Sequence, residues 1–226
     1  TDRYGLGFVR FEDDDLTMSR EWAMRLFRLL KDLRVHFDCL TRVDKVDNEL
    51  LREMAGAGCE VVYHGVESAS PRLRKLLRKG FPDSMTNEYV KETISREVAL
   101  GLTPTVSAMI GIPTETEQEV RETFDLMCDL KRRGARTQLW MMTPYPDTDA
   151  VSLYKEHLVR IDRWKELKQF DVFSQVPREA YTTLIKKYDY LIPDNWVFKN
   201  AVADFRKMKD LYLDGASRIL GELEFV

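Results

Sequence analysis

Two hydrophobic periods alternate along the first 155 residues of the chain. Short runs rich in β-branched and aromatic side chains predict strands at 5–11, 35–40, 61–66, 103–110 and 137–143. Between them, apolar side chains recur three and four residues apart, which predicts amphipathic helices. Strands that alternate with helices of this length are typical of a parallel sheet with crossover helices. Such a sheet closes as a barrel or lies open as a doubly wound sheet, and the pattern alone leaves both possible.

Polar residues mark where several of these helices begin. Ser19 and Asp47 precede apolar periods as N-caps, and Pro71 stands at a favoured first helical position. Thr116 is followed three residues later by Glu119, which predicts a capping box. The helices of the predicted sheet are therefore delimited by local chemistry as well as by hydrophobic spacing.

The pattern changes beyond residue 158. Residues 178–191 and 197–220 each have an apolar face at helical spacing, with a turn between them. We expect two units: a partial parallel α/β barrel over residues 1–158 and a helical appendage over residues 159–226.

Composition narrows the class of protein. A hydrophobic content of 44% and a charged content of 32% are ordinary for a globular domain. The net charge of -3 argues against a broad basic surface, so no nucleic-acid partner is expected. No apolar run approaches the roughly 20 residues of a membrane span. The three cysteines are far apart, which favours reduced thiols in the cytoplasm over a disulfide framework.

Polar or turn-forming residues follow each predicted strand, where parallel α/β folds bind ligands. They are Asp13 and Asp14, then Arg42 and Asp44, then Glu67 and Ser68, then Gly111 to Thr116, and finally Thr143, Pro144 and Tyr145.

Plainer interpretations stay open for several of these residues. Asp13 and Asp14 could cap the next helix, Arg42 could pair with Asp44 or Asp47, and Lys79 suits a helix C-terminus. His64 stands within a strand and is interpreted as a packed core histidine rather than a base.

Seven short strings, each at a strand end or helix stop, occur in an order that resembles radical S-adenosylmethionine (SAM) enzymes. They are Phe11-Glu12-Asp13-Asp14, Asp38 to Asp44, Ala57-Gly58-Cys59, His64-Gly65-Val66-Glu67-Ser68, Arg78-Lys79-Gly80, Met109 to Thr116 and Thr143 to Thr148. The resemblance spans about residues 4 to 155. It is closest to the branch that often carries an N-terminal cobalamin-binding domain, such as magnesium-protoporphyrin oxidative cyclase-like proteins.

The resemblance implies a partial barrel of six parallel strands, of which this chain begins at the second. The first strand and a Cys-x3-Cys-x2-Cys loop would lie in a missing N-terminal segment of the same protein. That loop would hold a 4Fe–4S cluster on which SAM is cleaved to a 5′-deoxyadenosyl radical. Cobalamin is a further candidate cofactor, in a domain outside this chain. Cys39 and Cys59 match cysteines common in the family that are not cluster ligands, and we expect this chain alone to hold no metal.

The same resemblance assigns roles by position. Asp13 and Asp14 would hold the SAM amino group, Glu67 the ribose hydroxyls with Ser68 beside it, and Lys79 the SAM carboxylate. Ile110 and Gly111 would approach adenine, Thr143, Pro144 and Tyr145 would lie by the base, and Arg42 would face the cluster or substrate. No catalytic residue is assigned. Thr114 and Asp147 stand where the family usually has glycine.

The leading hypothesis is therefore the SAM-binding part of a radical SAM enzyme that methylates or rearranges a hydrophobic or cofactor-like small molecule. A second hypothesis is a different α/β enzyme in which Asp13, Asp14 and Glu67 converge on a divalent metal. A third is a non-catalytic barrel that binds a partner.

Overall fold

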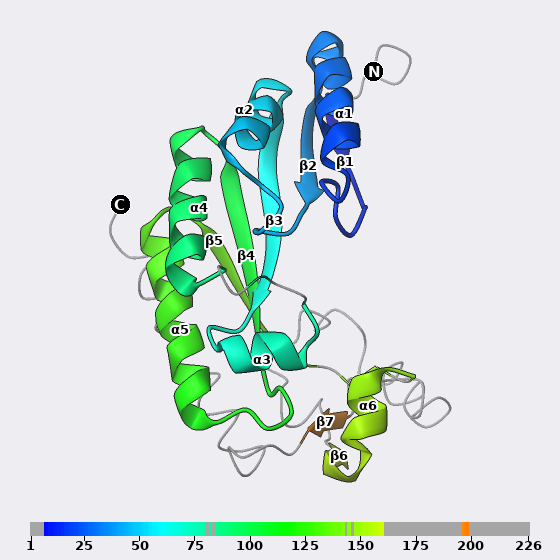
Figure 1. The fold of residues 1–226 in the computed structure, drawn as a ribbon, viewed down its shortest axis with the longest axis vertical. Coiled ribbons are helices and arrows are strands. Elements are labelled where there is room, and N and C mark those ends of the chain that lie inside the picture. Colours follow the sequence, from blue (N-terminus) through cyan, green and yellow to red (C-terminus); the bar gives the residue numbers. More distant parts are fainter. Residues whose placement is uncertain are drawn as a thin grey trace, which may run out of the picture.

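Five parallel strands form the sheet, in the spatial order β1-β2-β3-β4-β5, in a computed structural model that describes residues 7–79, 82, 85–142, 144–145, 147–160 and 196–198 (Figure 1). The strands are β1 (Phe8–Arg10), β2 (His36–Leu40), β3 (Cys59–Glu67), β4 (Thr103–Ile110) and β5 (Arg136–Met141). Every neighbouring pair is parallel. The sheet does not close, because β1 and β5 are its two edges. The predicted partial parallel barrel is confirmed.

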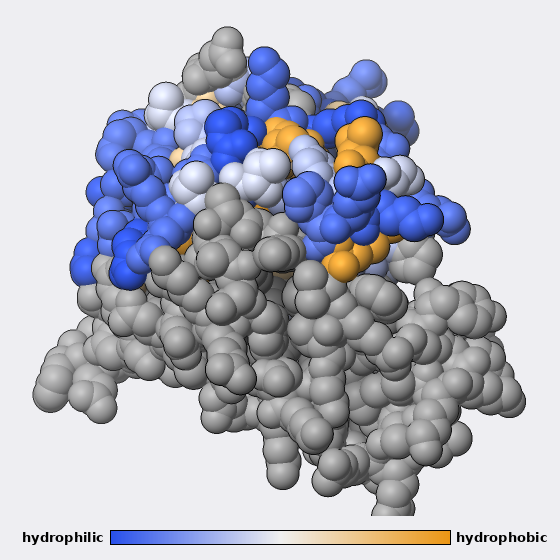
Figure 2. All heavy atoms as spheres, turned by 90° about the horizontal axis from the view of Figure 1, so that it is seen from below, coloured by the Kyte–Doolittle hydropathy of each residue, from blue (hydrophilic) through white to orange (hydrophobic). Residues whose placement is uncertain are grey.

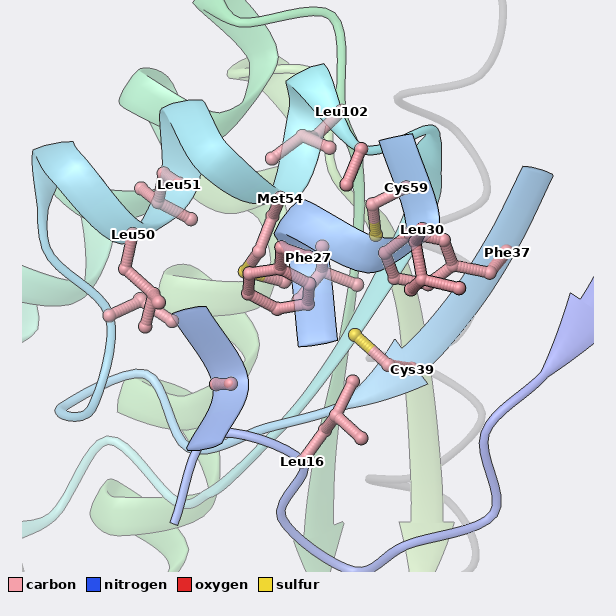
Figure 3. Packing of buried hydrophobic residues seen from close by; sticks show 14 of the residues in the cluster. Leu16, Phe27, Leu30, Phe37, Cys39, Leu50, Leu51, Met54, Cys59 and Leu102 are labelled. Carbon is pink, nitrogen blue, oxygen red and sulfur yellow. The ribbon is translucent and has the colours of Figure 1, made fainter. Parts of the chain in front are cut away.

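The helices between the strands are α1 (Arg20–Leu33), α2 (Asn48–Gly56), α3 (Pro71–Leu76), α4 (Asn87–Ala99) and α5 (Glu117–Arg132). Four of them, α1, α2, α4 and α5, pack on one face of the sheet in two apolar clusters, whereas α3 lies at the carboxyl ends of the strands (Figure 1). Helices α1 and α2 bury Phe27, Leu50 and Met54 against β2 and β3. Figure 3 shows Cys39 and Cys59 within this cluster, beside Phe37. The second cluster joins α4 and α5 to β3, β4 and β5.

The predicted caps are confirmed. Ser19 accepts a hydrogen bond from the Trp22 backbone N–H, and Asp47 accepts from Glu49 and Leu50. Thr116 and Glu119 form the complete capping box of α5. These helices begin where the sequence predicts because each cap satisfies backbone donors that the first turn leaves without partners.

The opposite face of the sheet is polar where β1, β2 and β3 meet. The buried Asp38 carboxylate accepts from the Arg10 Nε and from Nη2, the latter at 2.6 Å. The same Nη2 donates to the Tyr63 hydroxyl at 2.8 Å. Because side chains alternate along a strand, Arg10, Asp38 and Tyr63 lie on the face opposite Phe37, Cys39 and Val62 of the first apolar cluster. One face of the sheet thus meets helices and the other presents hydrogen-bonding groups.

The chain after β5 differs from its prediction. It forms α6 (Asp149–Leu153), a 3₁₀ turn (Lys155–His157) and β6 (Leu158–Arg160), which pairs antiparallel with β7 (Trp196–Phe198). Val197 and Phe198, predicted to begin a helix, are therefore in a strand, and the predicted boundary after residue 158 falls inside β6. The rest of the expected appendage, 161–195 and 199–226, lies outside the described residues. Within the described residues, no helix is long and apolar enough to cross a membrane.

Candidate functional site

Glu67 ends β3 in a conformation that few non-glycine residues adopt. Its φ is 67°, and the pairing of β3 with β4 shifts register between Gly65 and Glu67. The bulge at Val66 re-aims the Glu67 side chain, which is only 12% exposed. A left-handed backbone of this kind costs about 1–2 kcal/mol. Backbone strain of this kind clusters at binding and catalytic sites, which makes the end of β3 a candidate site.

The Glu67 carboxylate forms an ion pair with Lys79. The Lys79 Nζ lies 2.6 Å from Oε1 of Glu67, and both side chains are more than half buried. The pair lies directly over Gly65. A Cβ at position 65 would come within 2.4 Å of the Glu67 Oε1 and 3.1 Å of the Lys79 Nζ. Two residues that the sequence predicted for one ligand are thus brought together, and a glycine that the sequence analysis did not single out makes room for them.

Arg42 lies beside this pair and fixes the chain that carries Lys79. Its Nε and Nη2 each donate to the Asp44 carboxylate at 2.9 Å, and its Nη1 donates to the backbone carbonyl of Lys79. The pairing with Asp44 is the plainer of the two interpretations of Arg42. Arg42 therefore links the end of β2 to the segment after α3, where it orients Lys79.

The three aspartates after β1 separate into two kinds. Asp13 and Asp14 are exposed. Asp15 turns inward, and its Oδ1 accepts from the Thr17 backbone N–H at 3.1 Å and from the Thr41 hydroxyl at 3.1 Å. Asp15 ties the loop after β1 to the end of β2, so the adjacent Asp13 and Asp14 are displayed at the same edge as Glu67.

A buried carboxylate shapes the loop after β4. Ile110 is buried, and Gly111 follows it with a φ of 80°. The Gly111 and Ile112 backbone N–H groups donate to Oε2 of Glu115 at 2.6 and 3.2 Å. Burial raises the pKa of Glu115 to about 8, although these two donors act to lower it. Glu115 stands within the predicted strand-end run Gly111 to Thr116, but no role was predicted for it. Its signal is a carboxylate four residues after a strand-end glycine.

The remaining predicted residues lie around these groups. Ser68 is fully buried, and its hydroxyl lies 3.2 Å from the Thr123 hydroxyl of α5, so it joins the strand end to a helix. Pro144 is buried and Tyr145 is 61% exposed after β5. Thr143 lies outside the described residues.

Positive φ angles recur at the strand ends. Thr114 has a φ of 66° after β4 and Asp147 a φ of 62° after β5. These are the two positions at which the sequence departs from a glycine usual in the resembling family. Glycine adopts this conformation without steric cost, which gives a physical reason for its use there.

The described residues offer no metal centre. They contain no group of three or more histidine, cysteine, aspartate or glutamate side chains that could hold an ion. Cys39, Cys59 and Cys128 are free thiols buried in the core. Hydrogen bonding to Cys39 and burial raise the pKa of the Cys59 thiol, which opposes the thiolate form that metals bind. Within that part of the chain, neither an iron–sulfur cluster nor the divalent metal of the second hypothesis has a set of ligands.

The groups at the carboxyl ends of the strands suit a SAM molecule better than a metal ion. Seen from the carboxyl ends of the strands, the described surface is mainly hydrophilic with scattered apolar residues (Figure 2). A carboxylate, an ammonium and a bare glycine backbone meet at the end of β3, and a second bare backbone follows β4. The carboxylate suits hydroxyls, the ammonium suits a carboxylate, and the bare backbone after β4 suits a purine edge.

Comparison with known proteins identifies the family. The model of the radical SAM superfamily matches residues 2–127. That is more than half of the chain, and the protein belongs to this superfamily, whose members use SAM and a 4Fe–4S cluster.

Two curated methyltransferases are similar over most of the chain. An uncharacterised methyltransferase of Pyrococcus horikoshii is 28% identical over 205 residues, 84% of this chain and 43% of that protein. Bacteriochlorophyllide d C-12(1)-methyltransferase of Chlorobaculum tepidum is 24% identical over 217 residues, 87% of this chain and 46% of that protein. The chain spans less than half the length of these relatives.

Solved structures share the fold. TsrM of Kitasatospora setae, a radical SAM methyltransferase with cobalamin and a 4Fe–4S cluster bound, superposes with a TM-score of 0.61 at 20% identity, over 70% of this chain and 34% of that one. The cobalamin-dependent radical SAM enzyme OxsB gives 0.58 at 15% identity, over 96% and 39%.

Proposed function

We propose that this chain is the SAM-holding side of a radical SAM enzyme whose whole polypeptide methylates or rearranges a small molecule. The observation that carries the proposal is the Glu67–Lys79 pair over Gly65 at the carboxyl edge of the sheet. It is supported by family membership and by the two methyltransferase relatives.

The proposed roles follow from the chemistry of each group. The Glu67 carboxylate accepts from the two ribose hydroxyls, with the buried Ser68 bracing the strand end. Lys79 binds the SAM carboxylate, and Asp13 and Asp14 bind its ammonium. The Ile110–Gly111 backbone, held by Glu115, approaches adenine. Thr143, Pro144 and Tyr145 flank the base, and Arg42 orients Lys79.

The cluster comes, in this proposal, from a missing N-terminal segment of the same protein. The open edge of β1 supports this placement, because the strand order follows the chain order and a preceding strand would add there. Phe8 on β1 and Trp22 and Leu29 on α1 are 45%, 49% and 65% exposed. A preceding strand and helix would cover such apolar side chains. When bound, the cluster supplies the electron that cleaves SAM.

From the relatives we propose only the general class of the substrate and one further cofactor. We propose a small-molecule substrate and, because two of the matching solved structures, TsrM and OxsB, are cobalamin enzymes, cobalamin as a cofactor held outside this chain. The polar side chains of Arg10, Asp38 and Tyr63 on the face of the sheet opposite the helices would present hydrogen-bonding groups to a substrate. A cytoplasmic location fits the three reduced thiols.

SAM binding tests the proposal. Glu67→Ala in the full-length, cluster-loaded protein should weaken binding of S-adenosylhomocysteine, a stable SAM analogue, at least about 10-fold in calorimetric titration, because a partly buried charged hydrogen bond is lost. Glu60→Ala is the matched control, since Glu60 lies on the same strand but is exposed. Unchanged binding by Glu67→Ala would refute the site and favour the non-catalytic barrel of the third hypothesis.

A further inference from the structure

The Glu67–Lys79 pair poses a problem for any ligand that uses both residues. In the described structure the two groups bind each other at 2.6 Å. The pairing uses the Glu67 Oε1, which is one of the oxygens that ribose hydroxyls would donate to. The inference about this pair rests on the proposed function. A ligand whose ribose binds Glu67 must either displace the Lys79 ammonium or share the Glu67 carboxylate with it.

The fate of the ammonium then depends on the ligand. S-adenosylmethionine and S-adenosylhomocysteine carry a carboxylate, which gives a displaced Lys79 a new anionic partner. 5′-Deoxyadenosine has the same ribose hydroxyls and adenine but no carboxylate. It would leave the ammonium, 32% exposed, beside a carboxylate already engaged by hydroxyls. A partly buried charge without its partner is costly, so the second ligand is penalised.

We propose that Lys79 is a specificity-determining residue, whose ion pair with Glu67 favours adenosyl ligands that bring a carboxylate over those that have none. Selectivity of this kind arises from a penalty on the wrong ligand as much as from attraction to the right one. The consequence for a turnover cycle is that 5′-deoxyadenosine is held weakly once the methionine formed by SAM cleavage, with its carboxylate, has left the site.

The surrounding residues make the pair a defined structure rather than a chance surface contact. Arg42 holds the backbone carbonyl of Lys79 while its guanidinium is bound twice by Asp44. Gly65 leaves the space in which the two charged ends meet. The positive φ of Glu67 and the bulge before it aim the carboxylate at that space. The position of each partner is thus fixed by a different element.

The experiment compares two ligands on the full-length, cluster-loaded protein. Calorimetric titration gives the dissociation constants of S-adenosylhomocysteine and 5′-deoxyadenosine, and their ratio is the selectivity. Lys79→Met should tighten 5′-deoxyadenosine and weaken S-adenosylhomocysteine, reducing the ratio about 10-fold or more. Lys79→Arg keeps the charge and should keep the preference for the carboxylate ligand.

Two further variants sharpen the result. Lys75→Met removes the same charge from an exposed position on α3 and should leave the ratio unchanged. Gly65→Ala keeps both charges but places a Cβ where the pair meets, so it should lower the selectivity in a protein that still folds, because only the ends of two flexible side chains must move. Circular dichroism checks that each variant is folded.

The outcomes separate the two proposals. If the unsubstituted protein binds neither ligand, the proposed function fails. If it binds both and Lys79→Met leaves the ratio unchanged or weakens both ligands equally, the function stands and the selectivity role of Lys79 is overturned.

Discussion

Glu115 illustrates how one buried side chain links the shape of a loop to pH. Its Oε2 accepts from two backbone donors of the loop after β4, while its Oε1 is buried and has no hydrogen-bond partner among the described residues. An ionised carboxylate in this position is poorly solvated, and burial raises its pKa to about 8. Glu115 thus shapes the backbone that is proposed to meet adenine. Its ionisation lowers the stability of the folded protein, and this cost grows with pH.

We predict that Glu115→Gln flattens the pH dependence of stability. The folded pKa exceeds the ordinary value of 4.5, so the contribution of Glu115 is full below pH 4.5 and is lost as pH rises through about 8. Glutamine keeps the acceptor for Gly111 and Ile112 without the charge. Urea unfolding should show the variant about 1–3 kcal/mol more stable than the unsubstituted protein at pH 8, with a much smaller gap near pH 5. A constant difference between the two proteins across this range would contradict the assignment.

At the scale of elements, a buried pair joins the sheet to α4. The His64 Nε2 lies 2.9 Å from Oε1 of Glu97, and its Nδ1 lies 2.9 Å from the backbone carbonyl of Thr41. Both side chains are fully buried. Burial alone would lower the pKa of His64, but the attraction and hydrogen bond of Glu97 outweigh it and raise the pKa. His64 is a packed core histidine, as its position within a strand predicted.

We predict that removing one partner of this pair costs more than removing both. Glu97→Leu leaves an imidazole buried without its anion and should destabilise the protein by about 3–5 kcal/mol. The double variant His64→Leu, Glu97→Leu should recover part of that loss in chemical denaturation, because no buried polar group is then left alone. Additive losses in the double variant would show that the two residues act independently.

The elements up to β5 were predictable from sequence, and the details of the site and the strand β7 were not, for a physical reason. Caps such as Ser19 and Thr116 depend on residues within one turn, so local patterns reveal them. The approach of Glu67 and Lys79 over Gly65 depends on the paths of β3 and the segment after α3. Similarly, Asp15 rather than Asp13 turns inward because Thr41, far along the chain, lies there. The strand at Trp196–Phe198 is set by a partner at Leu158–Arg160.

At the scale of the whole molecule, the described residues bring together groups suited to an adenosyl ligand at the carboxyl edge of the sheet. The same residues contain no set of metal ligands. Cys39 and Cys59 lie in the apolar cluster between α1, α2 and the sheet (Figure 3), and Cys128 lies in the cluster of α4 and α5. Their role is therefore packing, and none of the three is placed to act as a ligand of a cluster.

The buried positions of the three thiols predict how the protein responds to their removal. In the full-length protein, Cys39→Ala, Cys59→Ala and Cys128→Ala combined should leave the iron content after anaerobic reconstitution unchanged, because none of the three is a ligand. Thermal stability should fall, since each truncation removes a sulfur from a packed core. Iron analysis and the visible absorption of the cluster measure the first effect, and calorimetry measures the second. Loss of iron without loss of stability would make one of these cysteines a ligand and would contradict the packing role that their burial indicates.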